Sequence, residues 1–188
     1  MSLKSTATQP IIPNGVMGIC LFIITEVMYF LSLISAYWII RSEYVQWPPW
    51  GQPRLPVTLT AFNTAILLFS GFLIYWFLYQ WKHNQFRIFY YLAGTALGFV
   101  FLFIQGYEWI QLIHFKLTLD SSNYGSIFYL IVGSHALHVL ATLVVMLKFA
   151  WDYFNQGQLD RTNIQVVSIF WYFVVAVWPV LYVVVYLF

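Results

Sequence analysis

Residues 124–151 read YGSIFYLIVGSHALHVLATLVVMLKFAW, an almost unbroken apolar run in which the one lysine or arginine, Lys148, stands near the end. About 20 mostly apolar residues in a helix are enough to cross a bilayer. A membrane β-barrel is excluded, because its strands are about 10 residues long and alternate in polarity. This stretch therefore predicts a transmembrane helix.

The same pattern recurs along the chain, in segments at residues 15–40, 57–80, 86–109, 124–151 and 162–188. Of the 188 residues, 62% are hydrophobic and only 7% are charged, whereas a typical soluble domain has about 25% charged residues. The sequence thus predicts an all-α, polytopic membrane protein with a bundle of five transmembrane helices. We expect one domain over residues 15–188, after a short cytoplasmic tail at residues 1–14.

The connections between these segments are too short to fold as domains. Residues 41–56 hold four prolines and a glycine, a composition that cannot continue a helix. The other links, at residues 81–85, 110–123 and 152–161, are shorter and make successive helices antiparallel neighbours. Pro179 is expected to kink the last helix. Whatever the protein does therefore takes place in or through the membrane.

Lysine and arginine residues divide unevenly between the two ends of the predicted helices. One end has Lys4, Lys82, Arg87, Lys148 and Arg161, and the other has Arg41, Arg54 and Lys116. Because cytoplasmic loops are enriched in Lys and Arg, this division predicts a cytoplasmic N-terminus and a C-terminus on the outer side. The net charge of only +2 and the lack of a basic run argue against a nucleic-acid partner.

Three ionisable side chains lie deep in the predicted spans, namely Glu26 in the first and His135 and His138 in the fourth. A charge at the bilayer centre costs about 2.5 to 3.5 kcal/mol, so such groups persist where a partner or a function compensates. Two interpretations of Glu26 stay open, a neutral carboxyl bonded to a neighbouring helix or a member of a proton relay. We hypothesise that Glu26 and His138 share a proton and tie the first helix to the fourth.

The paired histidines also suggest a metal or haem site, which a count of deep ligands disfavours. His135 and His138 share one face of one helix, so a bis-histidine haem would need another histidine at the same depth on a second helix. His83 and His114 fall in the predicted connections, and Cys20, the only cysteine, is expected to be a small buried hydrophobe. We therefore predict that this chain binds no metal and no redox cofactor itself.

Other polar residues of the spans are expected to form interhelical contacts, namely Asn63, Thr64, Gln105 and Glu108. Glu108 ends its predicted span near the outer interface, where a solvated carboxylate is ordinary. The small residues of Gly94–Gly98 predict close contact with a neighbouring helix. Three residues near the outer loop are candidate ligands of lipid headgroups, namely Arg41, Arg54 and Trp47.

Taken in order, these segments resemble subunit III of the haem-copper respiratory oxidases, of the cytochrome c or quinol type. The resemblance rests on Gly18 to Trp38 with Glu26 inside, Phe62-Asn63-Thr64-Ala65, Gln105 with Glu108-Trp109, and Tyr124 to Tyr129 followed by Gly133, His135 and His138-Val139. The most specific motif is the last, a Gly-Ser-aromatic run before Gly-x-His-x-x-His-Val. The likeness covers the chain from about Gly15 and is nearest to five-helix bacterial members.

The chain departs from this family in its C-terminal signature at residues 170–178. Tyr172 stands where a histidine is usual, and Val175 stands where an aspartate is usual. Any role of those two polar groups in the family does not carry over to this chain. Glu26, His135 and His138 are then expected to be most of the ionisable groups in the bundle interior.

The resemblance implies an accessory subunit of a terminal oxidase in a bacterial inner membrane, within aerobic electron transport and proton pumping. Such a subunit has no redox centre, packs against subunit I, supports its proton uptake and binds phospholipid, while haem and copper belong to partner subunits. A divergent second copy, a subunit-III-like component of a larger respiratory supercomplex and a haem-binding or proton-carrying protein remain alternatives. The choice between quinol and cytochrome c as electron donor depends on other subunits.

Overall fold

The computed structural model describes residues 14–157 and 160–188, and its long elements are all helices. Within these ranges they are α1 (Asn14–Ser42), α2 (Val57–Lys82), α3 (Ile88–His114), α4 (Asn123–Gln156) and α5 (Arg161–Tyr182), and α5 continues as a π-helical turn, η1 (Val183–Leu187). Five helices in this part of the chain are long and apolar enough to cross a membrane. The predicted all-α membrane bundle is thus confirmed. The expected tail lies outside the described residues except for Asn14, which begins α1.

The first four helices run further into the connections than the sequence predicts, α3 and α4 the furthest. α3 continues to His114 and α4 continues to Gln156. His114 is therefore the last residue of a helix and not a loop residue. The prediction ended these spans beside a charged residue, Glu108 or Asp152, whereas the backbone hydrogen bonds of a helix can continue into the interface.

Side-chain caps mark the starts of the last two helices. Ser122 Oγ accepts a hydrogen bond from Gly125 N at 3.1 Å at the start of α4, and Asp160 Oδ1 accepts from Thr162 N at 2.8 Å at the start of α5. Such caps satisfy backbone N–H groups that have no partner within the helix. α4 ends before Gly157, which has φ of +69°, a left-handed conformation that favours glycine.

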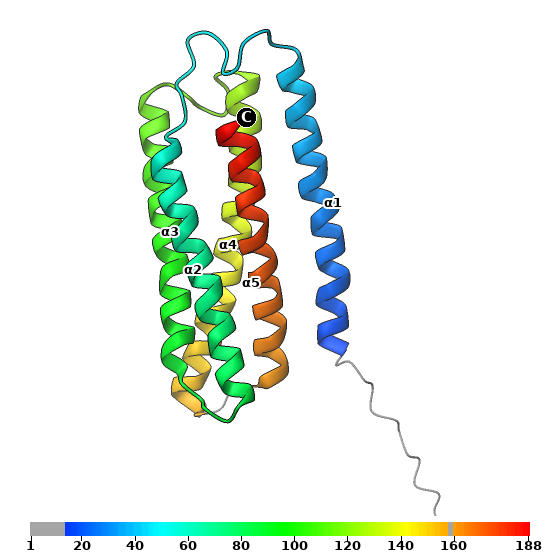
Figure 1. Cartoon of the computed structure of the whole chain (residues 1–188), viewed down its shortest axis with the longest axis vertical. Coiled ribbons are helices and arrows are strands. Elements are labelled where there is room, and N and C mark those ends of the chain that lie inside the picture. Colours follow the sequence, from blue (N-terminus) through cyan, green and yellow to red (C-terminus); the bar gives the residue numbers. More distant parts are fainter. Residues whose placement is uncertain (1–13, 158–159) are drawn as a thin grey trace, which may run out of the picture.

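α1 lies at the edge of the bundle. The other four helices pack together, and α1 contacts α4 and α5 along one side of them (Figure 1). In its most apolar stretch only 11% of residues are buried, against 33% to 44% in the other helices. Large apolar side chains point away from the bundle, among them Leu21, Ile24, Met28, Leu31 and Ile39. Cys20 is exposed on the same helix, so the expectation of a buried cysteine was wrong.

Glycines of α3 allow the close helix contact that the sequence predicts. A Cβ atom on Gly94 would lie 2.8 Å from Ile74 Cδ1 of α2, too close for a real contact. A Cβ atom on Gly98 would lie 2.7 Å from Leu143 Cδ2 of α4 and 2.8 Å from Trp171 Cη2 of α5. The small-residue face of α3 is therefore buried against three other helices, as in other membrane bundles.

Pro179 lies inside α5, and the helix runs on beyond it. Proline has no N–H and so removes one backbone hydrogen bond from a helix. One turn later, at Val183, the hydrogen bonding changes from the α to the π pattern. This π-helical turn places Tyr186 in the bundle interior, where it is buried.

Candidate functional site

The side chains of Glu26 on α1 and His138 on α4 meet between the two helices. Glu26 Oε2 lies 2.8 Å from His138 Nε2. The other ring nitrogen, His138 Nδ1, lies 2.7 Å from the backbone oxygen of Ser134. The contact expected from the sequence between the first and fourth helices is therefore present.

The contact with Ser134 determines which nitrogen of His138 bears a proton. A carbonyl oxygen can only accept, so Nδ1 is the N–H donor. His138 Nε2 and the Glu26 carboxyl then share one further proton. It lies either on Glu26, which gives two neutral groups, or on His138, which gives an ion pair. Both arrangements have the same net charge, so the pair as a unit brings no charge into the membrane.

Tyr29 makes a second hydrogen bond between α1 and α4. Ser134 Oγ donates its one proton to Leu130 O at 2.6 Å. Tyr29 Oη must therefore be the donor to Ser134 Oγ, at 2.7 Å. Tyr29 lies three residues after Glu26 and hence on the same face of α1. That spacing is the signal by which sequence reasoning could have placed Tyr29 in the site.

The polar contact between α1 and α4 is not fully enclosed by this chain. The side chains of His138 and Glu26 are 19% and 15% exposed, and Tyr29 is 39% exposed. Glu26 stands near the middle of α1, at the depth of the hydrocarbon in a bilayer. Polar atoms at that depth are costly unless other polar groups surround them.

His135 faces a different part of the bundle from His138. It is buried, its ring stacks on Trp178 of α5 with centroids 4.8 Å apart, and Phe101 of α3 meets it edge-on at 6.0 Å. Neither of its ring nitrogens has a hydrogen-bond partner among the described residues. Over residues 14–157 and 160–188, no group of three or more His, Cys, Asp or Glu side chains could hold a metal ion.

Glu108 is the more deeply buried of the two carboxyl groups inside the bundle, with none of its surface exposed. Tyr186 Oη donates to Glu108 Oε1 at 2.6 Å, and Thr60 Oγ1 lies 2.9 Å from Glu108 Oε2. Gln105 Nε2 in turn donates to Tyr186 Oη at 3.4 Å. The carboxyl is thus held between α2, α3 and η1.

One expectation about Glu108 was therefore wrong. It is not a solvated interfacial carboxylate, and it joins Glu26, His135 and His138 as an ionisable group of the bundle interior. Hydropathy places residue 108 near the membrane surface, but Thr60 and Tyr186, distant in the sequence, close around it. Sequence reasoning missed both partners, and neither forms a local pattern with Glu108 that could have revealed them.

Asn63 and Thr64 also join neighbouring helices. Asn63 Nδ2 donates to the backbone oxygen of Phe101 on α3 at 3.2 Å. Thr64 Oγ1 accepts from Trp178 Nε1 on α5 at 2.9 Å. Asn63 thus joins α2 to α3, whereas Thr64, Gln105 and Glu108 join α2 and α3 to α5 and η1.

The three candidate headgroup residues of the outer loop have separate surroundings. Trp47 packs edge-on against Tyr124, with ring centroids 4.9 Å apart. The guanidinium carbon of Arg41 lies 5.2 Å from the centroid of the Trp38 ring. Arg54 is exposed and lines a pocket with Trp47. Trp47 is thus also a packing residue, and the role of all three toward lipid stays a prediction.

Tyr172 and Val175, which replace the usual polar pair, face α2. Val175 is buried, and its Cγ1 would lie 3.1 Å from a Cβ atom on Gly71. Tyr172 lines a cavity between α2 and α5 together with Lys82 and Arg161. The sequence placed both cations on one side of the membrane, but it could not show that they share a cavity.

Comparisons with known proteins find related sequences along nearly the whole chain. A sequence model of the family Cytochrome c oxidase subunit III matches residues 3–188. The chain is 34% identical over 175 residues to cytochrome c oxidase subunit 3 of Synechocystis sp.. This alignment covers 90% of this chain and 74% of that protein. It is 29% identical over 193 residues to cytochrome bo(3) ubiquinol oxidase subunit 3 of Buchnera aphidicola, covering 100% of this chain and 98% of that protein.

A third relative is the probable cytochrome c oxidase subunit 3 of Mycobacterium leprae, with 32% identity over 188 residues, 93% of this chain and 88% of that protein. The matched relatives include subunits of both cytochrome c and quinol oxidases. With five helices in its described residues that are long and apolar enough to cross a membrane, and a family match over nearly its whole length, this multi-pass membrane protein belongs to the subunit III family of the haem-copper respiratory oxidases.

Proposed function

We propose that the chain, as subunit III, has no redox centre of its own, packs against the haem- and copper-bearing subunit I, and preserves the proton uptake of that subunit during turnover. The observation that carries this proposal is the position of the Glu26–His138 pair. It lies near mid-membrane depth, beside a helix that is mostly outside the bundle, and part of its polar surface is exposed.

A protein partner covers such a surface better than lipid tails do. Lipid tails are as apolar as leucine, so the apolar side chains of α1 alone would favour neither lipid nor protein. Glu26, His138 and Tyr29 differ, because hydrocarbon offers their exposed polar atoms no hydrogen bond. A neighbouring helix that covers them would exclude water and strengthen the contact between Glu26 and His138.

Support of proton uptake is proposed as an indirect effect. The chain would act by holding the adjoining surface of subunit I in its working shape and by keeping lipid in place beside it. Loss of the chain should then leave the initial rate of oxygen reduction largely intact but shorten the time for which activity lasts.

We further propose a bacterial inner membrane as the location, with the start of α1 on the cytoplasmic side. Lys82, Arg87, Lys148 and Arg161 lie toward that end of the helices, which supports the assignment by the positive-inside rule. Phospholipid headgroups on the opposite side would lie beside Arg41, Arg54 and Trp47.

A deletion experiment tests the proposed function. The oxidase is purified from cells with and without this chain, and oxygen consumption is followed through many turnovers after reconstitution into vesicles. We expect similar initial rates and a half-life of activity that is several-fold shorter without the chain. Equal half-lives, or complete loss of initial activity in a fully assembled subunit I, would contradict an accessory role.

A further inference from the structure

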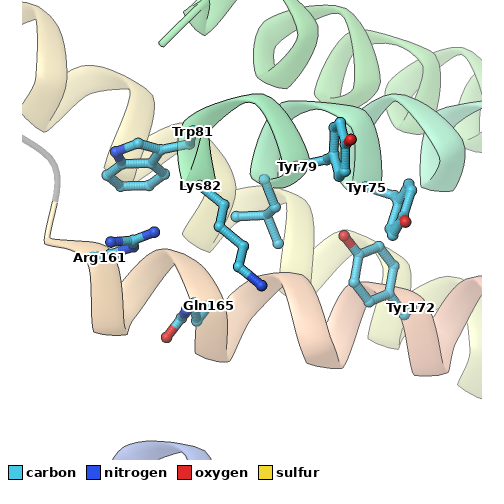
Figure 2. A pocket seen from close by; sticks show the side chains of 8 residues that line it. Tyr75, Tyr79, Trp81, Lys82, Arg161, Gln165 and Tyr172 are labelled. Carbon is cyan, nitrogen blue, oxygen red and sulfur yellow. The ribbon is translucent and has the colours of Figure 1, made fainter. Parts of the chain in front are cut away.

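Glu108 lies at the end of the bundle where α2 begins and α3 ends. Its contact on α2, Thr60, is three residues after the start of that helix, which is about 5 Å along the helix axis at 1.5 Å per residue. The cavity lined by Lys82, Arg161 and Tyr172 lies at the other end of α2 (Figure 2). Glu108 is therefore near the side of the membrane where α1 ends.

Glu108 is the middle member of a chain of hydrogen bonds. On one side, Gln105 Nε2 donates to Tyr186 Oη, and Tyr186 Oη donates to Glu108 Oε1 at 2.6 Å. On the other side, Glu108 Oε2 lies 2.9 Å from Thr60 Oγ1, which in turn lies 3.0 Å from the backbone oxygen of Pro56. Both oxygens of the carboxyl group therefore have a partner.

No positive charge balances Glu108 within the part of the chain that the structure describes. The residue is fully buried, and none of the described residues forms a salt bridge with it. The titratable groups that face it are two phenols, Tyr186 on η1 and Tyr129 on α4, and α2 contributes the hydroxyl of Thr60. The Tyr129 hydroxyl donates elsewhere, to a backbone oxygen. A buried carboxylate without a cation is very costly, whereas a hydrogen-bonded neutral carboxylic acid is not.

The contacts of Thr60 fit a neutral carboxylic acid at residue 108. The Thr60 hydroxyl has one proton and two neighbouring oxygens, Glu108 Oε2 and Pro56 O. Both contacts are hydrogen bonds at the same time if Glu108 Oε2 bears a proton and donates it to Thr60 Oγ1, while Thr60 donates to Pro56 O. Tyr186 then donates to Oε1, the carbonyl oxygen of the same acid.

Tyr186 also lines a cavity of about 240 Å³ beside the loop that precedes α2. Other walls of this cavity come from Arg54, Val57 and Leu187, and all three are exposed. Tyr186 thus contacts both the buried carboxyl and a cavity that reaches the surface. It belongs to the π-helical turn η1, and such turns are frequent at functional sites.

We propose that Glu108 is a proton-binding site that exchanges its proton with the aqueous phase on the side of the membrane where α1 ends. Oε2 holds the proton. A water molecule that passes Tyr186 from the cavity gives one proton to the carboxyl group and takes one away, so the net charge of the site does not change. The site stores one proton near the membrane surface, apart from the proton that Glu26 and His138 share at mid-membrane depth.

Infrared spectroscopy of the full-length chain in detergent tests the protonation of Glu108. A protonated carboxyl has a carbonyl band that a carboxylate lacks, and this band shifts when deuterium replaces the proton. We expect Glu108→Gln to lose one such band at neutral pH. This variant should fold, because its amide can donate to Thr60 and accept from Tyr186. If Glu108→Gln loses no carboxyl band, the residue is ionised and the proposal is overturned. Glu26→Gln identifies any band of the other carboxyl.

The hydrogen bond from Tyr186 is tested in the same spectra. Tyr186→Phe removes the donor to Glu108 Oε1, so the band lost in Glu108→Gln should move to higher wavenumber. The matched control is Tyr182→Phe, because Tyr182 stacks on Tyr186 but its hydroxyl lies 3.1 Å from the backbone oxygen of Val57. An equal shift in both variants, or no shift in Tyr186→Phe, would overturn the assigned chain of hydrogen bonds.

The rate of deuterium exchange tests the route through the cavity. After transfer to heavy water, the Glu108 band should shift while the protein stays folded. Leu187→Trp fills the cavity and should slow this exchange several-fold, and Val57→Trp repeats the test from the opposite helix. Val180→Trp is the matched control, because Val180 is 51% exposed and Leu187 is 53% exposed, but Val180 lies outside the cavity.

Two results would overturn exchange through this cavity. One is an equal rate in the cavity variants and the Val180→Trp control, and the other is a band that exchanges only when the protein unfolds. These measurements need no partner subunit. They therefore succeed or fail independently of the proposed function, which is measured through the lifetime of oxidase activity.

Discussion

Glu26 Oε2 on α1 and His138 Nε2 on α4 lie 2.8 Å apart, although the two residues are 112 positions apart in the sequence. The backbone oxygen of Ser134 fixes a proton on Nδ1 of the same ring. The carboxyl and the imidazole therefore work as one unit with a single shared proton. This unit ties the peripheral helix to the rest of the bundle.

Replacing Glu26 and His138 singly and together measures the interaction free energy between the two side chains. Glu26→Leu or His138→Ala alone leaves one polar group unpaired, whereas the double variant removes both. We expect a coupling of about 0.5 to 2 kcal/mol in the free energy of unfolding in detergent, the range of interhelical hydrogen bonds in membrane proteins. Glu26→Gln should cost least, because its amide can still donate to Nε2. Strictly additive losses would mean that the two side chains do not interact.

Glu108 should matter more for stability than its position near the membrane surface suggests. Glu108→Leu leaves the hydroxyl of Tyr186 without its acceptor in a buried site, at a cost of about 1 to 3 kcal/mol, whereas the hydroxyl of Thr60 keeps the backbone oxygen of Pro56 as an acceptor at 3.0 Å. We expect a clear fall in the melting temperature of the purified chain, and a smaller one for Tyr186→Phe. Tyr107→Phe, at an exposed position of the same helix, is the control and should have little effect. A Glu108→Leu variant as stable as this control would show that the carboxyl is solvated after all.

The close packing of α3 can be tested with two glycines of the same helix. Gly98→Ala places a methyl group against Leu143 and Trp171, and overpacking of this kind costs about 1 to 3 kcal/mol. Gly106→Ala meets no atom within 4 Å and should be neutral or stabilise the helix by up to about 1 kcal/mol. Thermal unfolding of both variants in the same detergent gives the comparison. A harmless Gly98→Ala would contradict the contact with α4 and α5.

The five helices could be predicted from the sequence because each needs only a long apolar run. Their ends could not, since charged residues, Glu108 in α3 and Asp152 in α4, interrupt the apolar runs while the helices continue past them. The contact of Glu26 with His138 was accessible because both residues are costly at that depth and each needs a partner. The burial of Glu108 was not, because it depends on Thr60 and Tyr186, which approach it only in the folded bundle. For the same reason, the sequence could not show that Lys82 and Arg161 line one cavity.

The orientation in the membrane is tested by reporters fused to the chain. A reporter that is active only outside the cytoplasm, such as alkaline phosphatase, is joined after Phe188, and in a second fusion it is placed in the link at residues 83–87. We expect activity from the first fusion and none from the second, because Lys82, Arg87 and Arg161 hold their end of the bundle in the cytoplasm. The reverse pattern would invert the topology and place Lys82, Arg87 and Arg161 on the outer side.

The most direct measurement is the ratio of haem to chain after affinity purification from native membranes. With a tag on the chain and a mild detergent, we expect haem in the eluate only together with the subunits that bind it. Glu26→Ala should lower that ratio several-fold, whereas Glu43→Ala, at an exposed position just after α1, should leave it unchanged. A chain that purifies alone with its own haem, or a Glu26→Ala variant that retains the haem-bearing subunits in full, would contradict an accessory subunit held through α1.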